Sequence, residues 1–317
     1  MSKWLVDTSK NLSNDSSFTD CVIIVGATTF KCHKLILSYA SEFFKRMFLG
    51  DFKEALSGRI YLEDISPTTF KIFRDYIYTY DKNNLNECTT QTITDLFVCG
   101  NRWLVPSIIE DCLNILIERA KSMKVEDLID LFELGHSFDS KSLIKEVSAV
   151  LTSKHYKYLF CDKVLQLSYH AFSEYISVTA KLKTEIERYK MIAKYLELNG
   201  FLDESTMGKE TVDCSIKQKS GDFENNNTNL KKDETNEEQM EIIDAESEKP
   251  DCQRHNETYV QGLLGSINYT KMSGDEFYEG PGKSKFLTQE AKYEILYKIQ
   301  SRRISRLNVL LNQYRAM

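Results

Sequence analysis

The sequence predicts an α+β fold, in which a small sheet flanked by helices precedes an all-α region. Two β-branched runs and a third short run lie within the first 65 residues, whereas apolar side chains beyond about residue 80 recur at helical spacing. The 317 residues, of which 42% are hydrophobic, suffice for two modest domains with cores of their own.

Three strands are predicted near the amino end. The runs CVIIVG (21–26) and TTFKCH (28–33) are rich in β-branched residues and are separated by a turn at Gly26 and Ala27, which predicts a hairpin. A third strand is predicted at RIYLED (59–64). The sheet is therefore expected to be small.

Helices are predicted between and after these strands. Residues 34–49 carry apolar side chains at helical spacing from Leu35 onward. Ser41 is a possible cap residue, so a new helix is predicted to start near it. Ser66 followed by Pro67 predicts a helix start. After a polar break at 81–87, further helices are predicted within 92–120, at 125–134 and 140–151, near 158–169, and at 183–198.

An acidic segment follows these helices. Residues 205–256 hold thirteen acidic and seven basic side chains, so the whole net charge of −6 lies there. Such a composition buries too little apolar surface to offset its ordering entropy, and we predict an acidic disordered insert at 204–256. An interaction tail, a phosphorylation target and a passive tether remain open, and composition favours the tether.

Charge, hydropathy and cysteine spacing restrict the class of protein. The charge balance does not favour direct nucleic-acid binding, and no apolar run is long enough to cross a bilayer or to form a secretory signal. The eight cysteines contain no CxxC pair, which favours free thiols. We expect a cytoplasmic or nuclear protein that makes no membrane contact.

The amino-terminal pattern resembles a BTB domain, also called POZ. The resemblance rests on Asp20, the strand pair, His33 with Lys34, Ser41, and a strand and aspartate before a Phe-bearing helix, together with Phe30, Leu37, Phe44, Met47 and Phe48. It covers about a hundred residues and implies a BTB/POZ domain at 19–121, preceded by an N-terminal dimerisation segment at 1–18.

The region that follows resembles a BACK domain, the helical region that often trails BTB. Lys183, Thr184 and Glu185 open a helix as in that family, and residues 263–296 resemble its later part. The resemblance implies a first BACK part at 122–203 and a later BACK region with a C-terminal helix at 257–317. Kelch repeats and zinc fingers are not recognisable in this sequence.

Local motifs for catalysis are weak. The five histidines show no metal-ligand spacing such as HExxH, and His33 is expected to serve the fold. The string GPGKS (280–284) is interpreted as a turn before a helix capped by Thr288 rather than as a phosphate-binding loop. We therefore expect no enzyme activity, no cofactor, and no catalytic, cofactor-binding or metal-binding residues.

Phe52, Lys53 and Glu54 are the strongest interaction candidates. In the cullin-3-binding BTB domains that the sequence resembles, a hydrophobic-any-glutamate motif occupies this position, which makes Phe52 and Glu54 candidate cullin contacts with Met47 and Phe48 packed behind them. The alternative is a loop in which Phe52 merely covers the core.

A second candidate surface lies at the amino end. Trp4, Leu5 and Leu12 fall at helical spacing, and in BTB domains a helix here packs against the partner subunit, so these are candidate dimer-interface residues. An ordinary tail is the alternative. At the other end, the stretch from Arg302 to Arg315 is interpreted as a solvated helix face rather than as a nucleic-acid patch.

Together these features favour a non-catalytic interaction adaptor. The resemblance implies a homodimer that recruits an unknown client protein to a cullin-3 ubiquitin ligase complex for ubiquitination. The alternative is a BTB dimer that acts as a scaffold or transcription-associated regulator without cullin binding.

Overall fold

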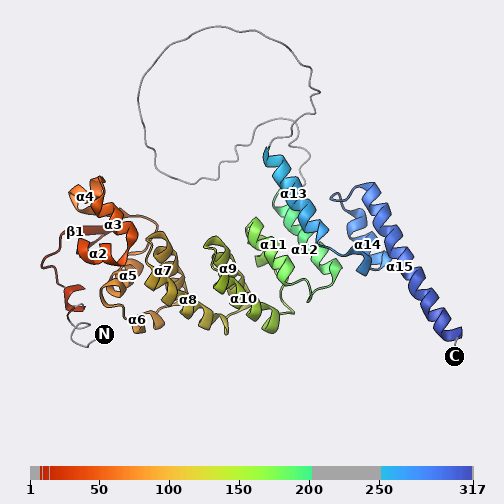
Figure 1. The fold of residues 1–317 in the computed structure, drawn as a ribbon, viewed down its shortest axis with the longest axis horizontal. Helices are drawn as coiled ribbons and strands as arrows, with labels where there is room; N and C mark the ends of the chain where they lie inside the picture. Colours follow the sequence, from red (N-terminus) through yellow and green to blue (C-terminus); the bar gives the residue numbers. More distant parts are fainter. Residues whose placement is uncertain (1–7, 9, 14, 202–250, 316–317) are drawn as a thin grey trace, which may run out of the picture. The chain divides into compact units, whose positions relative to one another are not determined.

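The computed structural model describes residues 8, 10–13, 15–201 and 251–315 (Figure 1). The chain divides into two compact units, Met1–Leu182 and Lys183–Met317. The predicted insert at 204–256 lies outside the described residues except for 251–256, which are helical, at the start of α13 (Asp251–Gly265), rather than disordered as predicted.

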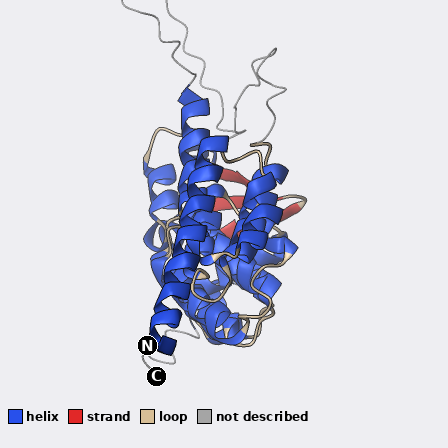
Figure 2. Ribbon diagram, turned by 90° about the vertical axis from the view of Figure 1, so that its right-hand side faces the viewer, coloured by secondary structure: helices blue, strands red, loops and turns tan. Residues whose placement is uncertain are grey.

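The sheet of the first unit has three strands in the order β2-β1-β3 (Figure 2). Strands β1 (Cys21–Val25) and β2 (Thr28–Cys32) pair antiparallel, with Cys21 opposite Cys32, and β3 (Arg59–Leu62) pairs parallel to β1. Gly26 turns the hairpin with a φ of 54°, a conformation that glycine adopts without strain. The predicted hairpin and third strand are confirmed.

Three helices connect β2 to β3, and a fourth follows the sheet. They are α2 (Lys34–Ala40), α3 (Glu42–Leu49), α4 (Lys53–Ser57) and α5 (Pro67–Thr79). Helix α3 starts anew at Ser41, as predicted, because the Ser41 hydroxyl accepts a hydrogen bond from the Phe44 amide at 3.1 Å. Ser66 caps α5 in the same way, by accepting from the Thr69 amide at 2.9 Å.

The core of the first unit centres on Trp103, which is 2% exposed. Its ring contacts those of Phe73, Phe44 and Phe70, with centroids 4.6, 5.8 and 6.0 Å away. Edge-to-face aromatic contacts of this kind add about 0.5–1.5 kcal/mol each beyond the burial of apolar area. These rings come from α3, α5 and the end of α7 (Thr90–Arg102), and they pack those helices against one another.

Three helices complete the first hundred and twenty residues. They are α6 (Asn83–Asn86), α7 (Thr90–Arg102) and α8 (Pro106–Ala120). The polar stretch 81–87 was predicted as a break, but it contains α6, because Leu85 is fully buried and holds one helical turn against the core.

His33 has the structural role that the sequence analysis gives it. Its Nδ1 lies 2.8 Å from the Tyr78 hydroxyl, and its Nε2 lies 3.1 Å from the Ser17 carbonyl oxygen. Both ring nitrogens are therefore engaged in holding the end of β2 to α5 and to the segment before β1.

The first unit ends in a helical region. It comprises α9 (Val125–Ser137), α10 (Lys141–Lys154), the 3-10 helix η1 (Asp162–Gln166) and α11 (Tyr169–Val178). The helix predicted near 158–169 is wrong. That stretch forms turns and η1, and helix α11 begins only at Tyr169. Ser168, the residue before this helix, donates its amide to Glu133 Oε2 at 2.9 Å.

The second unit is helical among its described residues. Its elements are α12 (Glu185–Leu198), α13 (Asp251–Gly265), η3 (Tyr269–Lys271), α14 (Gly274–Glu279), η4 (Pro281–Lys283) and α15 (Gln289–Arg315). The buried Arg188 joins α12 to the end of α13 by donating to Glu185 Oε2 at 2.7 Å and to the Ser266 carbonyl at 3.2 Å. The GPGKS string forms the turn η4, as predicted.

Candidate interaction surfaces

Four residues form an apolar surface with one acid at the junction of α3 and α4, here called the α3–α4 surface: Leu49, Phe52, Glu54 and Leu56. Leu49 is 78% exposed, Phe52 53% and Leu56 91%. Phe52 occupies the position before the first residue of α4, and Glu54 lies in the first turn of that helix. Residues 53–57 form a short helix, and the side chains of Phe52 and Leu56 are exposed, whereas the alternative interpretation expected Phe52 to cover the core.

Gly50 allows the Phe52 ring to lie where it does. A Cβ atom at position 50 would lie 2.8 Å from Cε2 of Phe52, closer than real contacts allow. The ring thus rests on the bare backbone at the end of α3 while half of it stays exposed. Among the described residues, the Glu54 carboxylate has no hydrogen-bond or ion-pair partner. Both side chains are available to a partner protein.

Met47 and Phe48 lie in the last turns of α3, and both are half-buried; their predicted packing behind Phe52 and Glu54 stays a prediction. The Phe48 ring stacks on that of Phe44 with centroids 6.3 Å apart. The Lys34 ammonium lies 5.4 Å from the Phe48 ring centroid and donates to the Ala55 carbonyl at 3.0 Å. One lysine of α2 therefore holds α3 and α4 in place, which orients the exposed residues in front of them.

The predicted dimer-interface residues are described only in part. Trp4 and Leu5 lie outside the described residues, and Leu12 is half-buried in a helical turn at 10–13. The sequence analysis placed Leu35 on the apolar face of its helix, but Leu35 is 65% exposed because the α2 core position is taken by Leu37. Tyr39, one turn further on the same side of α2, is 87% exposed.

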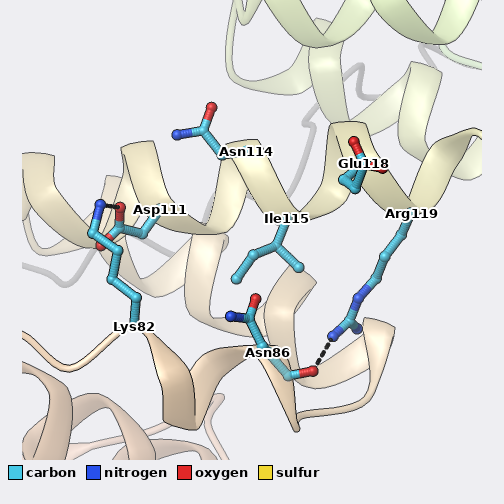
Figure 3. A pocket seen from close by; sticks show the side chains of 7 residues that line it. All are labelled: Lys82, Asn86, Asp111, Asn114, Ile115, Glu118 and Arg119. Carbon is cyan, nitrogen blue, oxygen red and sulfur yellow. Dashed lines mark hydrogen bonds and ion pairs between the residues drawn. The ribbon is translucent and has the colours of Figure 1, made fainter.

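A pocket of about 350 Å³ lies between α6 and α8 (Figure 3). The buried Asp111 carboxylate accepts hydrogen bonds from the Tyr76 hydroxyl at 2.7 Å and from the Lys82 ammonium. Burial, helped by Asp111, raises the pKa of Tyr76 well above its usual value. Seven side chains line the pocket: Lys82, Asn86, Asp111, Asn114, Ile115, Glu118 and Arg119.

The charged groups of this pocket hold the fold together. The Arg119 guanidinium donates to the carbonyls of Asn86 and Cys88 at 3.0 and 2.8 Å, and Glu118 pairs with Lys121 at 2.6 Å. Each charged side chain among the seven described lining residues is thus already engaged. The arrangement ties α6 to the start of α7 and to α8, and supplies neither a free base nor a nucleophile.

A second apolar surface lies on α15. Tyr293, Tyr297, Ile304 and Leu307 are spaced so that they share one side of the helix, and each is more than half exposed. Arg302 donates to the Thr270 hydroxyl at 3.0 Å. We call Tyr293, Tyr297, Ile304 and Leu307 the α15 stripe. The sequence analysis described this region by its arginines and missed its tyrosines, although their spacing of four residues marks one helix face.

No described helix is both long and apolar enough to span a lipid bilayer.

Comparison with known proteins identifies the amino-terminal part. Residues 9–120 match the BTB/POZ domain family. Kelch-like protein 40a of Danio rerio is 30% identical over 145 residues, which are 46% of this chain and 22% of that protein. Kelch-like protein 40 of Homo sapiens is 32% identical over 139 residues (44% and 21%), and Kelch-like protein 41 of Mus musculus is 25% identical over 188 residues (59% and 29%).

These matches cover about a fifth to a third of the length of the relatives. Among solved structures, the BTB domain of zebrafish PATZ1 is 24% identical, with a TM-score of 0.30, and the match covers 37% of this chain and 93% of that one. The chain therefore contains a BTB/POZ domain at 9–120 and is similar to Kelch-like proteins over 44–59% of its own length, and the small sheet with its helices is followed by a helical region consistent with a BACK domain.

Proposed function

We propose that this chain is a non-catalytic, homodimeric adaptor that recruits a client protein to a cullin-3 ubiquitin ligase. The observation that carries the proposal is the half-exposed Phe52 with Glu54 two residues later, whose carboxylate has no partner within the described part of the chain. They stand where the resembling cullin-3-binding BTB domains carry a hydrophobic-any-glutamate motif. Phe52 and Glu54 are assigned to the cullin contact, with Met47 and Phe48 supporting them.

The α3–α4 surface has the physical properties of an interaction hot spot. A phenylalanine presents roughly 200 Å² when fully exposed. With 53% of that accessible, Phe52 leaves about 100 Å² to bury, which is worth at most about 2.5 kcal/mol of binding free energy. In the proposed contact, the exposed Leu49 and Leu56 add further apolar area, and Glu54 supplies a directed polar interaction.

Dimerisation is assigned to α2 and to the amino-terminal segment. Leu35 and Tyr39 form an exposed apolar pair that a second copy covers in an isologous, two-fold arrangement, together with the predicted Trp4, Leu5 and Leu12. Two cullin contacts then flank one client, which raises the effective concentration of ligase around it.

The client contact is assigned to the second unit. The α15 stripe is an apolar helix face that can bind in a groove or against a helix of a partner protein, as amphipathic helices do. The chemistry that it offers is aromatic and aliphatic, with arginines beside it, which suits a client with an apolar, acidic surface.

The test measures the affinity of the purified full chain for purified cullin-3 by calorimetry. The Phe52→Ala, Glu54→Ala double variant is expected to lose about 2 kcal/mol or more, which is about 30-fold in Kd, while gel filtration still shows a dimer. Tyr61→Ala is the matched control, because Tyr61 is an exposed aromatic of the same domain outside the α3–α4 surface.

The outcomes separate the proposal from its alternative. An unchanged Kd in the double variant contradicts the assignment of Phe52 and Glu54. A wild-type dimer that does not bind cullin-3 at all favours the scaffold or transcription-associated function. A Leu35→Glu, Tyr39→Glu variant that stays dimeric contradicts the dimer surface on α2.

A further inference from the structure

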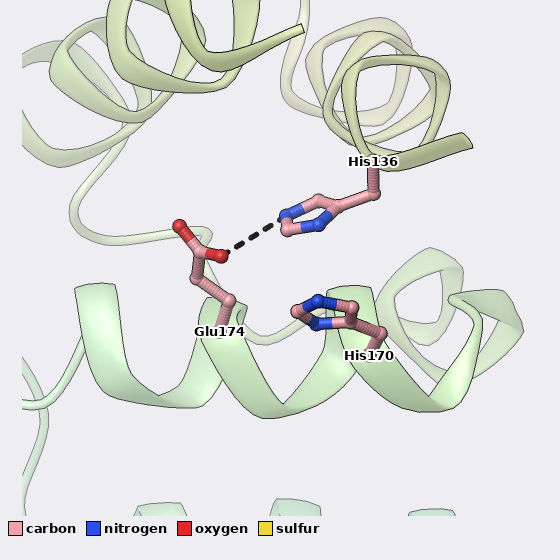
Figure 4. A group of neighbouring side chains, drawn as sticks. All are labelled: His136, His170 and Glu174. Atoms are coloured by element: carbon pink, nitrogen blue, oxygen red, sulfur yellow. Dashed lines mark ion pairs between the residues drawn. The ribbon is translucent and has the colours of Figure 1, made fainter. Parts of the chain in front are cut away.

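Three side chains that could ligate a metal meet between α9 and α11: His136, His170 and Glu174 (Figure 4). His136 lies in the last turn of α9, and His170 and Glu174 lie one turn apart on the same face of α11. One ligand atom from each residue lies within 4.8 Å of the other two. We propose that this cluster, here called the His-His-Glu cluster, binds one Zn²⁺ ion and thereby cross-links α9 to α11.

The strongest observation is the unsatisfied nitrogen of His136. Its side chain is only 6% exposed, and its Nε2 is buried without a hydrogen-bond partner among the described residues. It points toward Glu174, whose Oε2 is 3.7 Å away, too far for a hydrogen bond. A buried polar atom without a partner is costly, and a bound cation between the two atoms removes that cost.

The distances fit a zinc ion. Zn²⁺ binds histidine nitrogen and carboxylate oxygen at about 2.0–2.2 Å, so two ligand atoms of one ion lie up to about 4 Å apart. The separation of 3.7 Å between Nε2 of His136 and Oε2 of Glu174 therefore accommodates an ion between them. His170 is exposed, and a side-chain movement of about 1 Å brings its nitrogen to the same ion.

The residue types of the cluster suit zinc. Two histidines and one carboxylate are a ligand set that zinc takes in proteins, with a fourth position left to water.

The helices that carry the cluster are held in register independently of any ion. Glu133, one turn before His136, accepts a hydrogen bond from the Ser168 amide at 2.9 Å, at the start of α11. The Phe132 ring packs on that of Tyr175 with centroids 5.5 Å apart and on the His136 ring at 4.6 Å. The two helices are therefore positioned before the ion arrives, and only the exposed His170 side chain has to move, which favours binding.

The test uses the full chain, stripped with a chelator and titrated with Co²⁺ as a spectroscopic substitute for Zn²⁺. We expect one ion per chain by elemental analysis, visible ligand-field bands of a four-coordinate site, and no near-ultraviolet thiolate band, since no cysteine belongs to the cluster. Zn²⁺ is expected to displace the Co²⁺ and to raise the melting temperature of the protein.

Variants assign the ion to the cluster. His170→Ala and Glu174→Gln alter partly exposed side chains, so the fold is expected to survive, as circular dichroism checks. Each is expected to weaken Co²⁺ binding about 100-fold or more. His155→Ala is the matched control, because it removes another histidine of the same unit without touching the cluster, and is expected to bind like wild type.

Two results overturn the proposal. One is a wild-type chain that binds Co²⁺ no more tightly than the His170→Ala variant, in which case a water molecule or nothing bridges His136 and Glu174. The other is an ion whose spectrum shows thiolate ligation and persists in both variants, which places it at cysteines elsewhere in the chain.

Discussion

Tyr76→Phe tests the network beneath the α6–α8 pocket. The substitution keeps the ring and removes the hydroxyl that donates to Asp111 at 2.7 Å. Asp111 is 5% exposed, so its carboxylate cannot replace that hydrogen bond with bulk water. A hydrogen bond to a charged group contributes about 1.5–3 kcal/mol, and we expect the free energy of unfolding to fall by that amount.

For a unit of this size, 1 kcal/mol corresponds to about 2–4 °C, so the melting temperature should fall by about 3–12 °C. Tryptophan fluorescence reports it, because Trp103 lies in the same core. Tyr61→Phe is the control, since Tyr61 is 66% exposed, and its expected change is within about 0.5 kcal/mol. The reasoning is refuted if the two variants melt within about 1 °C of each other.

Three further predictions concern thiols, a helix cap and close packing. Burial raises the pKa of the Cys112 thiol to about 12, so iodoacetamide at pH 8 should label Cys112 in the native chain far more slowly than the partly exposed Cys161. Peptide mass spectrometry measures both labelling rates, and equal rates would contradict the burial of Cys112. Hydrogen bonds from Thr184 lower the pKa of Glu187, so the cap stabilises the fold above the unfolded pKa and this contribution is lost as pH falls through the lower folded value. Glu187→Gln should therefore flatten the acid side of the stability profile, and a variant with the wild-type slope would count against the cap. Gly100→Ala places a Cβ 2.6 Å from an isoleucine methyl of α8 and should destabilise by about 1–3 kcal/mol in urea unfolding, whereas a neutral change would mean that the helices separate freely.

Local signals predicted much of the first unit correctly. The β-branched runs, the turn at Gly26 and the cap at Ser66 before Pro67 each specify a structure through neighbouring residues, and each element forms where it was expected. The restart at Ser41 was predicted for the same reason, because its side chain caps the next turn.

Elements decided by distant contacts were missed. Helix α6 forms because Leu85 is buried in a core built by other helices. Its neighbours in the sequence are polar, so the local pattern gave no sign of a buried helix. Helix α11 begins at Tyr169 because Glu133, 35 residues earlier, accepts from the Ser168 amide. The presence of α6 and the start of α11 both depend on a tertiary contact, and the apolar periodicity within one segment carries no information about such a contact.

The candidate sites divide along the same line. Phe52 and Glu54 were found because they lie two residues apart at a recognisable position of the sequence, and their assignment remains a prediction. The His-His-Glu cluster was missed, and no metal was expected, because His136 comes from α9 whereas His170 and Glu174 come from α11. The available signal was the spacing of His170 and Glu174 on one helix face, which is too common to predict a site without its third member.

Sedimentation equilibrium of the purified chain, alone and with cullin-3, tests the adaptor proposal most directly. The proposal predicts a species of twice the 36.8 kDa chain mass on its own, and a complex of two chains with two cullins when the partner is added. A monomer, or a dimer whose mass does not increase in the presence of cullin-3, would contradict it.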